Sequence, residues 1–124
     1  MFVPGSPYPQ HQIAEIVDRA IAEGDPERAL QWARGLKQVG LDRALALTVV
    51  LGRNDDGRYL VAAQRFLVRF ILEARPSLLN LKKVVDALDV VGRVRQMPEL
   101  QEGAETALED LGRRLRDSDV GEVP

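Results

Sequence analysis

The sequence predicts an all-α protein of about six helices, arranged as stacked antiparallel hairpins in a short solenoid-like stack or a helical bundle. Along most of the chain, apolar residues recur every three or four positions, which is the spacing of one face of an α-helix. No run of alternating apolar and polar residues is long enough to predict a strand. In addition, a ten-residue pattern at Gly24–Ala33 returns 33 residues later at Gly57–Phe66. A period near this length is typical of stacked helical hairpins.

Length and composition are those of one globular domain. The 124 residues include 45% apolar and 29% charged side chains, and the formal net charge is −2. We expect an extended arm over residues 1–9, because three prolines and a glycine prevent regular structure there. One helical domain should follow over residues 10–116, and a flexible polar tail over residues 117–124.

The expected location of the protein follows from what the sequence lacks. It contains no cysteine, which excludes disulfides and thiolate metal sites. The N-terminus has no basic region followed by an apolar segment, as a secretion signal would. The longest apolar run, Ala44–Leu51, is too short to cross a bilayer. We therefore expect a cytoplasmic protein that has no membrane partner.

The first two helices are predicted over Gln10–Glu23 and from Asp25 to about Gln38. Gly24 ends the first helix, Asp25 is a good N-cap for the second, and Gly40 closes the second. The apolar positions of this pair share one face of each helix; they are Ile13, Ile16, Val17, Ala20 and Ile21, then Ala29, Leu30, Ala33 and Leu36, with Trp32 at the edge.

The third helix is predicted over Leu41–Arg53 and the fourth over Arg58–Ala74. The third is apolar on all sides, so it should be central and covered by several neighbours. The polar cluster Asn54–Gly57 predicts the turn between them. The fourth helix should bury a broad apolar face, formed by Tyr59, Leu60, Ala63, Phe66, Leu67, Phe70 and Ile71.

The fifth helix is predicted over Leu78–Val91, capped by Ser77, and the sixth over Pro98–Arg116. The acids of the sixth helix come early and its bases late, which suits the helix macrodipole. The fifth helix should turn inward Leu78, Leu81, Val84, Val85 and Leu88, and the sixth Leu100, Ala104, Ala107, Leu108, Leu111 and Leu115.

The repeated pattern pairs Gly24 with Gly57 and Ala29 with Ala62. A glycine turn before a second helix, with a small residue five positions later, resembles a degenerate tetratricopeptide-type (or Sel1-like) repeat over residues 10–74. The resemblance implies two equivalent hairpins that touch at Ala29 and Ala62, because large side chains would block close approach of the paired helices. It also implies a surface that holds another protein.

The first helix of each hairpin departs from the tetratricopeptide pattern. Val17 and Val50 stand where that pattern has a small glycine, and Ala20 and Arg53 stand where it has a bulky aromatic residue. A generic helical bundle with a coincidental period therefore remains an alternative interpretation.

Residues that catalysis or metal binding would need are few. The single histidine, His11, lies near the start of the first helix, where exposure to solvent is expected. Asn54, Asp55 and Asp56 offer oxygen ligands beside Gly57, but the closing glutamate of a calcium loop is missing, so a capping turn is predicted instead. No glycine-rich phosphate loop is present. We expect no enzymatic activity, no cofactor and no bound metal.

Charge is distributed unevenly along the chain. Residues 57–95 carry eight bases and three acids, whereas residues 96–124 carry three bases and eight acids. The sixth helix could lie across the basic region, the basic region could bind an acidic partner or nucleic acid, or both could be ordinary solvated faces. The candidate interaction residues are the cations Arg65, Arg69, Lys82, Lys83 and Arg93 and two aromatic residues at helix edges, Trp32 and Tyr59, for which a place in the peripheral core is the alternative.

Three functions are compatible with these patterns. The leading hypothesis is a non-enzymatic interaction or adaptor module that holds another protein or a second copy of itself. The second is a nucleic-acid-associated regulator that uses the basic region 57–95. The third is a small enzyme or ligand-binding bundle with a pocket between its helices.

Overall fold

The computed structural model of this chain describes residues 8–121, and it gives side chains up to residue 117. The elements are α1 (Gln10–Ala22), α2 (Pro26–Ala33), α3 (Leu41–Arg53), α4 (Tyr59–Ala74), α5 (Leu78–Gly92), a short 3₁₀ turn η1 (Pro98–Leu100) and α6 (Gln101–Gly121). The described residues contain no strand, and the predicted all-α fold is confirmed. Most of the predicted arm, residues 1–7, and the tail residues 122–124 lie outside the described part.

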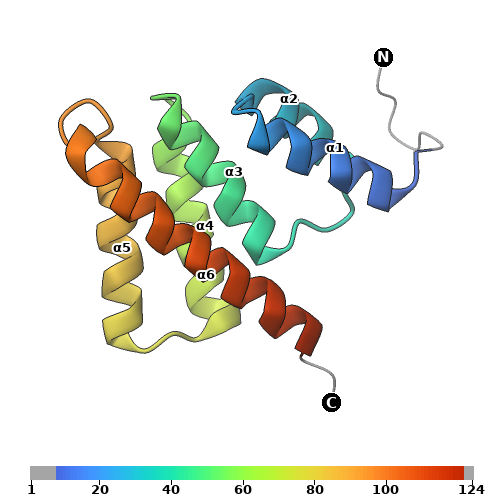
Figure 1. Cartoon of the computed structure of the whole chain (residues 1–124). Helices are drawn as coiled ribbons and strands as arrows, with labels where there is room; N and C mark the ends of the chain where they lie inside the picture. Colours follow the sequence, from blue (N-terminus) through green and yellow to red (C-terminus); the bar gives the residue numbers. More distant parts are fainter. Residues whose placement is uncertain (1–7, 122–124) are drawn as a thin grey trace.

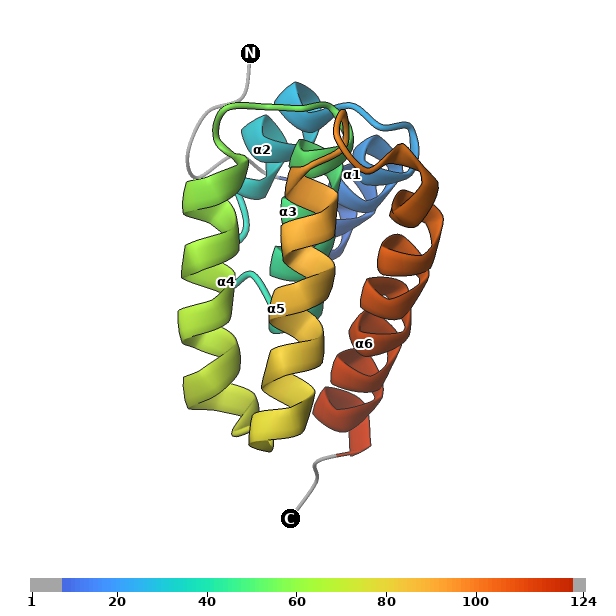
Figure 2. The same cartoon turned by 90° about the vertical axis from the view of Figure 1, so that its left-hand side faces the viewer.

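Helix α3 lies at the centre of the molecule (Figure 1), with α1 and α2 on one side and α4, α5 and α6 on the other. It contacts all five other helices, as its apolar sequence predicts. Figure 2 shows α4, α5 and α6 side by side, with α3 behind α5. The larger core joins α3 to these three helices, and a smaller core joins α1 and α2 to Leu47 of α3.

The hairpin of α1 and α2 is formed by the predicted turn. Gly24 takes a positive φ of 73°, and the Asp25 side chain accepts a hydrogen bond from the Arg28 N–H at 3.1 Å. Ala29, at 0% exposed, lies at the contact between the two helices.

Helix α2 ends at Ala33, so its predicted extension to Gln38 is wrong. The side chain of Gln10, the first residue of α1, forms hydrogen bonds with the backbone that follows α2. Its Nε2 donates to the Gly35 carbonyl at 3.1 Å, and its Oε1 accepts from the Lys37 N–H at 2.8 Å. These bonds hold backbone groups that a continuing helix would have used itself.

The turn between α3 and α4 differs from the turn between α1 and α2. Asp55, not Gly57, takes the left-handed conformation, with a φ of 50°. The Asp56 N–H then donates to the Leu51 carbonyl at 3.0 Å. The equivalent hydrogen bond in the first turn runs from the Asp25 N–H to the Ala20 carbonyl. The two glycines thus have different conformational roles, and the resemblance to tetratricopeptide repeats stays a prediction.

The last two helices follow the predicted order with shifted ends. The Ser77 side chain accepts a hydrogen bond from the Asn80 N–H at 3.1 Å, as expected of the residue that caps α5. Helix α6 continues to Gly121, beyond the predicted end at Arg116.

Candidate interaction surface

Helices α4 and α5 expose an unusual amount of aliphatic side chain. The residues of α4 that enter the core recur every three or four positions, at Tyr59, Ala63, Phe66 and Phe70. Apolar residues nonetheless continue around the rest of the helix. We call the exposed aliphatic residues of both helices the α4–α5 surface; they are Leu60, Val61, Val68, Ile71, Leu72, Leu78, Leu79 and Val85.

Four residues of this surface were predicted to be buried, and that prediction is wrong. Leu60 and Ile71 are 65% and 45% exposed, and Leu78 and Val85 are 84% and 41% exposed. The core face of α5 is narrower than predicted, because it is formed by Val84, Ala87, Leu88 and Val91. Two residues that were predicted to face inward from the sixth helix, Leu100 of η1 (48% exposed) and Ala107 of α6, are exposed as well.

A shallow groove runs along the α4–α5 surface between the two helices. It has a volume of about 380 Å³, and its apolar walls include Leu60 and Leu67 of α4 and Val85 of α5. Asp89 and Arg93 stand at its edge and pair with each other at 3.1 Å. The groove is therefore an apolar depression bordered by a neutral ion pair.

Tyr59, one of the two aromatic candidates, is buried in the core behind this surface. It links α4 to α5. Its hydroxyl donates to the Leu88 carbonyl at 2.5 Å, and its ring lies against two glycines, Gly52 of α3 and Gly92 of α5. Burial, and then the charge of Asp89, raise the pKa of the phenol above its usual range. Tyr59 therefore supports the α4–α5 surface from behind.

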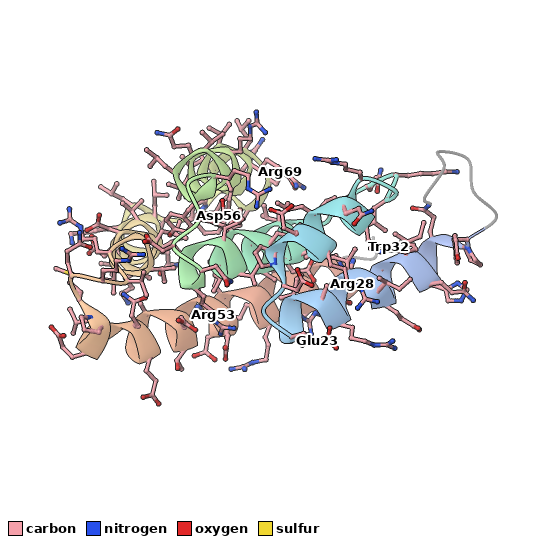
Figure 3. The ribbon with its side chains drawn as sticks, turned by 90° about the horizontal axis from the view of Figure 1, so that it is seen from above. Glu23, Arg28, Trp32, Arg53, Asp56 and Arg69 are labelled. Carbon is pink, nitrogen blue, oxygen red and sulfur yellow. The ribbon has the colours of Figure 1, made fainter. Side chains whose placement is uncertain are left out.

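Trp32 lies on a different part of the molecule, on α2, whereas Arg69 is on α4 (Figure 3). The indole is half-buried against the small core of α1 and α2. The ring of Tyr8 meets it edge-on, with the ring centres 5.5 Å apart. Trp32 thus belongs to the α1–α2 hairpin and not to the α4–α5 surface.

Three of the five candidate cations are paired with an acid one helical turn further along or back. Arg69 bonds to Glu73 at 2.7 Å and Lys82 to Asp86 at 2.7 Å, and Arg93 is held by the Asp89 described above. Arg65 and Lys83 are exposed, and no ion pair holds either of them within the described residues. The paired cations offer an incoming phosphate little unbalanced charge.

The candidate cations also face different depressions. Arg69 borders the loop that leads into α3, near Gln38 and Leu41. Lys83 borders a groove between α5 and α6, opposite Arg114. Since Arg93 faces the groove between α4 and α5, Arg69, Lys83 and Arg93 border three different depressions.

The acids of α6 pair with α3 instead of lying across the candidate cations. Arg53 of α3 points toward α6 (Figure 3), where its guanidinium bonds to Glu105 at 2.5 Å and stands 3.6 Å from Glu109. Arg116 of α6 reaches Asp42 of α3 at 3.4 Å. Within the described residues, the proposed match between the sixth helix and Arg65, Arg69, Lys82, Lys83 and Arg93 is therefore not formed.

His11 and Ser77 lie at the starts of two different helices, α1 and α5. His11 is exposed at the start of α1, and Ser77 is engaged as the cap of α5. Across residues 8–121, no three His, Cys, Asp or Glu side chains gather as metal ligands. None of the described helices combines the length and the apolar character that crossing a bilayer requires.

Comparisons of this chain with protein-family models, with curated proteins and with solved structures found no match.

Proposed function

We propose that this chain is a helical protein-interaction module that binds its partner through the α4–α5 surface. The observation that carries the proposal is the exposure of eight large aliphatic residues on two neighbouring helices. Scattered apolar residues are normal on a protein surface, but a large exposed group of them marks an interaction site.

The support beneath this surface suits a binding role. A rigid platform loses little conformational entropy when a partner docks. The backs of both helices are fixed in the larger core by Phe66 and Phe70, whose rings stack with centres 5.6 Å apart, and by the hydrogen bond from Tyr59 to α5.

A nucleic-acid partner is the weaker alternative. It would need several unpaired cations on one face, whereas Arg69, Lys82 and Arg93 are paired, and Arg69, Lys83 and Arg93 line different grooves. The apolar character of the exposed surface also favours a protein over a phosphate backbone.

The proposal is tested by photo-crosslinking in cells that express the chain. A photo-reactive amino acid would replace Leu72 or Leu79, which are 69% and 62% exposed, and Leu100 would serve as the control because it is a 48% exposed leucine outside the surface. We expect protein adducts from positions 72 and 79 and none from position 100. Equal adducts from all three positions, or none from positions 72 and 79, would contradict the proposal.

A further inference from the structure

We infer that the partner of the α4–α5 surface is a second copy of this chain, related by a two-fold axis through that surface. This inference rests on the proposed function, and it adds the identity of the occupant. Each copy would contribute the antiparallel pair α4 and α5, and the four helices would pack as a bundle around the shared apolar residues.

The exposed area has the size that such a pairing needs. The exposed fractions of the eight aliphatic residues correspond to about 800 Å² of mostly apolar surface. Each partner in a standard protein–protein interface contributes ~800 Å², so the eight residues together expose an area of that size. A chain that left this area uncovered would carry a persistent risk of non-specific association.

The charges on the two helices favour a self-complementary contact. A surface that meets its own copy must not carry charge of one sign, because each charge would then face its equal. Here Lys82 pairs with Asp86 and Arg93 pairs with Asp89, so four of the charged groups cancel within α5. Arg65 of α4 has no ion pair among the described residues. Lys83 of α5 has none either, so only two separate cations of α4 and α5 would face a second copy without a partner of their own.

The same charge balance argues against an anionic membrane or nucleic acid as the occupant. Attraction to a phosphate surface grows with each unpaired Lys or Arg that reaches it. Among the described residues of α4 and α5, Arg65 and Lys83 supply such a charge, since Arg69 and Lys82 are each held by an acid of their own helix.

The first test measures the mass of the purified chain in solution, by sedimentation equilibrium between about 1 and 200 µM. We expect the wild type to reach twice the monomer mass. Leu72→Glu or Leu78→Glu should raise the dissociation constant at least about 30-fold, the effect of a typical interface hot spot. Leu100→Glu, the same chemical change outside the surface, should leave it unchanged. Because Leu72 and Leu78 are 69% and 84% exposed, both variants should keep the wild-type circular dichroism spectrum.

The second test locates the axis by using the absence of cysteine in the chain. In a Val68→Cys variant, any disulfide must join two copies, and residues near a two-fold axis meet their own equivalents. We expect mild oxidation to give at least about ten times more covalent dimer from Val68→Cys than from the control Thr106→Cys on α6.

A wild type that remains monomeric at 200 µM would overturn the inference, and so would a dimer that survives both glutamate variants. The proposed function has a separate outcome. If the chain is monomeric while position 72 still captures another protein in cells, the interaction surface stands and only its occupant is different. If position 72 captures nothing, the proposed function fails as well.

Discussion

Gly52 of α3 lies directly against α5, and we predict that replacing it with alanine destabilises the fold. A Cβ at this position would stand 2.4 Å from Val91 Cγ1 and 2.9 Å from Tyr59 Cε1, whereas carbon atoms in normal contact are about 3.5–4.0 Å apart. Both neighbours are buried, and the Tyr59 hydroxyl is fixed on the Leu88 carbonyl. Neither can turn into solvent, so α3 and α5 must move apart.

Two opposing terms set the size of the effect of Gly52→Ala. Alanine is favoured over glycine in a helix interior by about 1 kcal/mol, whereas forcing a methyl group into a packed core costs about 1–3 kcal/mol. The overlap with Val91 exceeds about 1 Å, which places the cost at the upper end of that range. The free energy of unfolding should therefore fall by about 1–2 kcal/mol.

Urea unfolding followed by circular dichroism measures this change, and Gly112→Ala is its matched control. Gly112 lies inside α6, and a Cβ there meets nothing within 4 Å. The control should therefore become more stable by about 0.5–1 kcal/mol. Val91→Ala removes the closest obstacle, so the double variant with Gly52→Ala should show a favourable coupling of at least about 0.5 kcal/mol. A Gly52→Ala protein as stable as the control would refute the reasoning.

Three further predictions concern the phenol, the second turn and the alternative partner. The raised pKa of Tyr59 means that the stability contributed by the neutral phenol is present below pH 10 and lost as the pH rises further. The free energy of unfolding measured in urea should thus fall more steeply above pH 10 for the wild type than for Tyr59→Phe. Equal slopes of this free energy against pH for the two proteins would contradict the prediction. The side-chain hydrogen bond from Arg58 lowers the pKa of Asp56 to about 2. The stability that the ionised Asp56 contributes is therefore lost as the pH falls through about 2. Arg58→Gln should return this pKa toward 3.8 in an NMR titration, and an unchanged value would assign the shift to another group. Fluorescence anisotropy with a 20-base-pair DNA duplex, at about 50 mM salt, should show no binding up to about 50 µM protein; tight binding that Arg65→Glu abolishes would favour the nucleic-acid alternative instead.

The helices themselves could be predicted because their limits are encoded locally. Asp25 and Ser77 cap the helices that follow them, and the apolar circumference of α3 predicts its central place. The early end of α2 could not be predicted in this way. It depends on Gln10, which is distant in sequence and captures the backbone at Gly35 and Lys37.

The candidate surface was missed because helical periodicity does not say which apolar face another element covers. Leu78 and Val85 have the spacing of core residues, yet both are exposed, and Val85 lines the groove between α4 and α5. One signal was present in the sequence. The apolar positions of α4 extend around most of the helix, and Val61, Val68 and Leu72 lie outside the single stripe that one neighbour can cover.

The most direct test of the α4–α5 surface measures whether it is covered when the protein works. Hydroxyl-radical footprinting would compare the oxidation of individual leucines in cells that express the chain with their oxidation in the purified protein at high dilution. Leu72 and Leu78, at 69% and 84% exposed, should be oxidised at least about five times more slowly in cells, whereas Leu100, at 48% exposed, should react equally in both. Equal oxidation of all three leucines under the two conditions would contradict the account, because the surface would then be free in the cell.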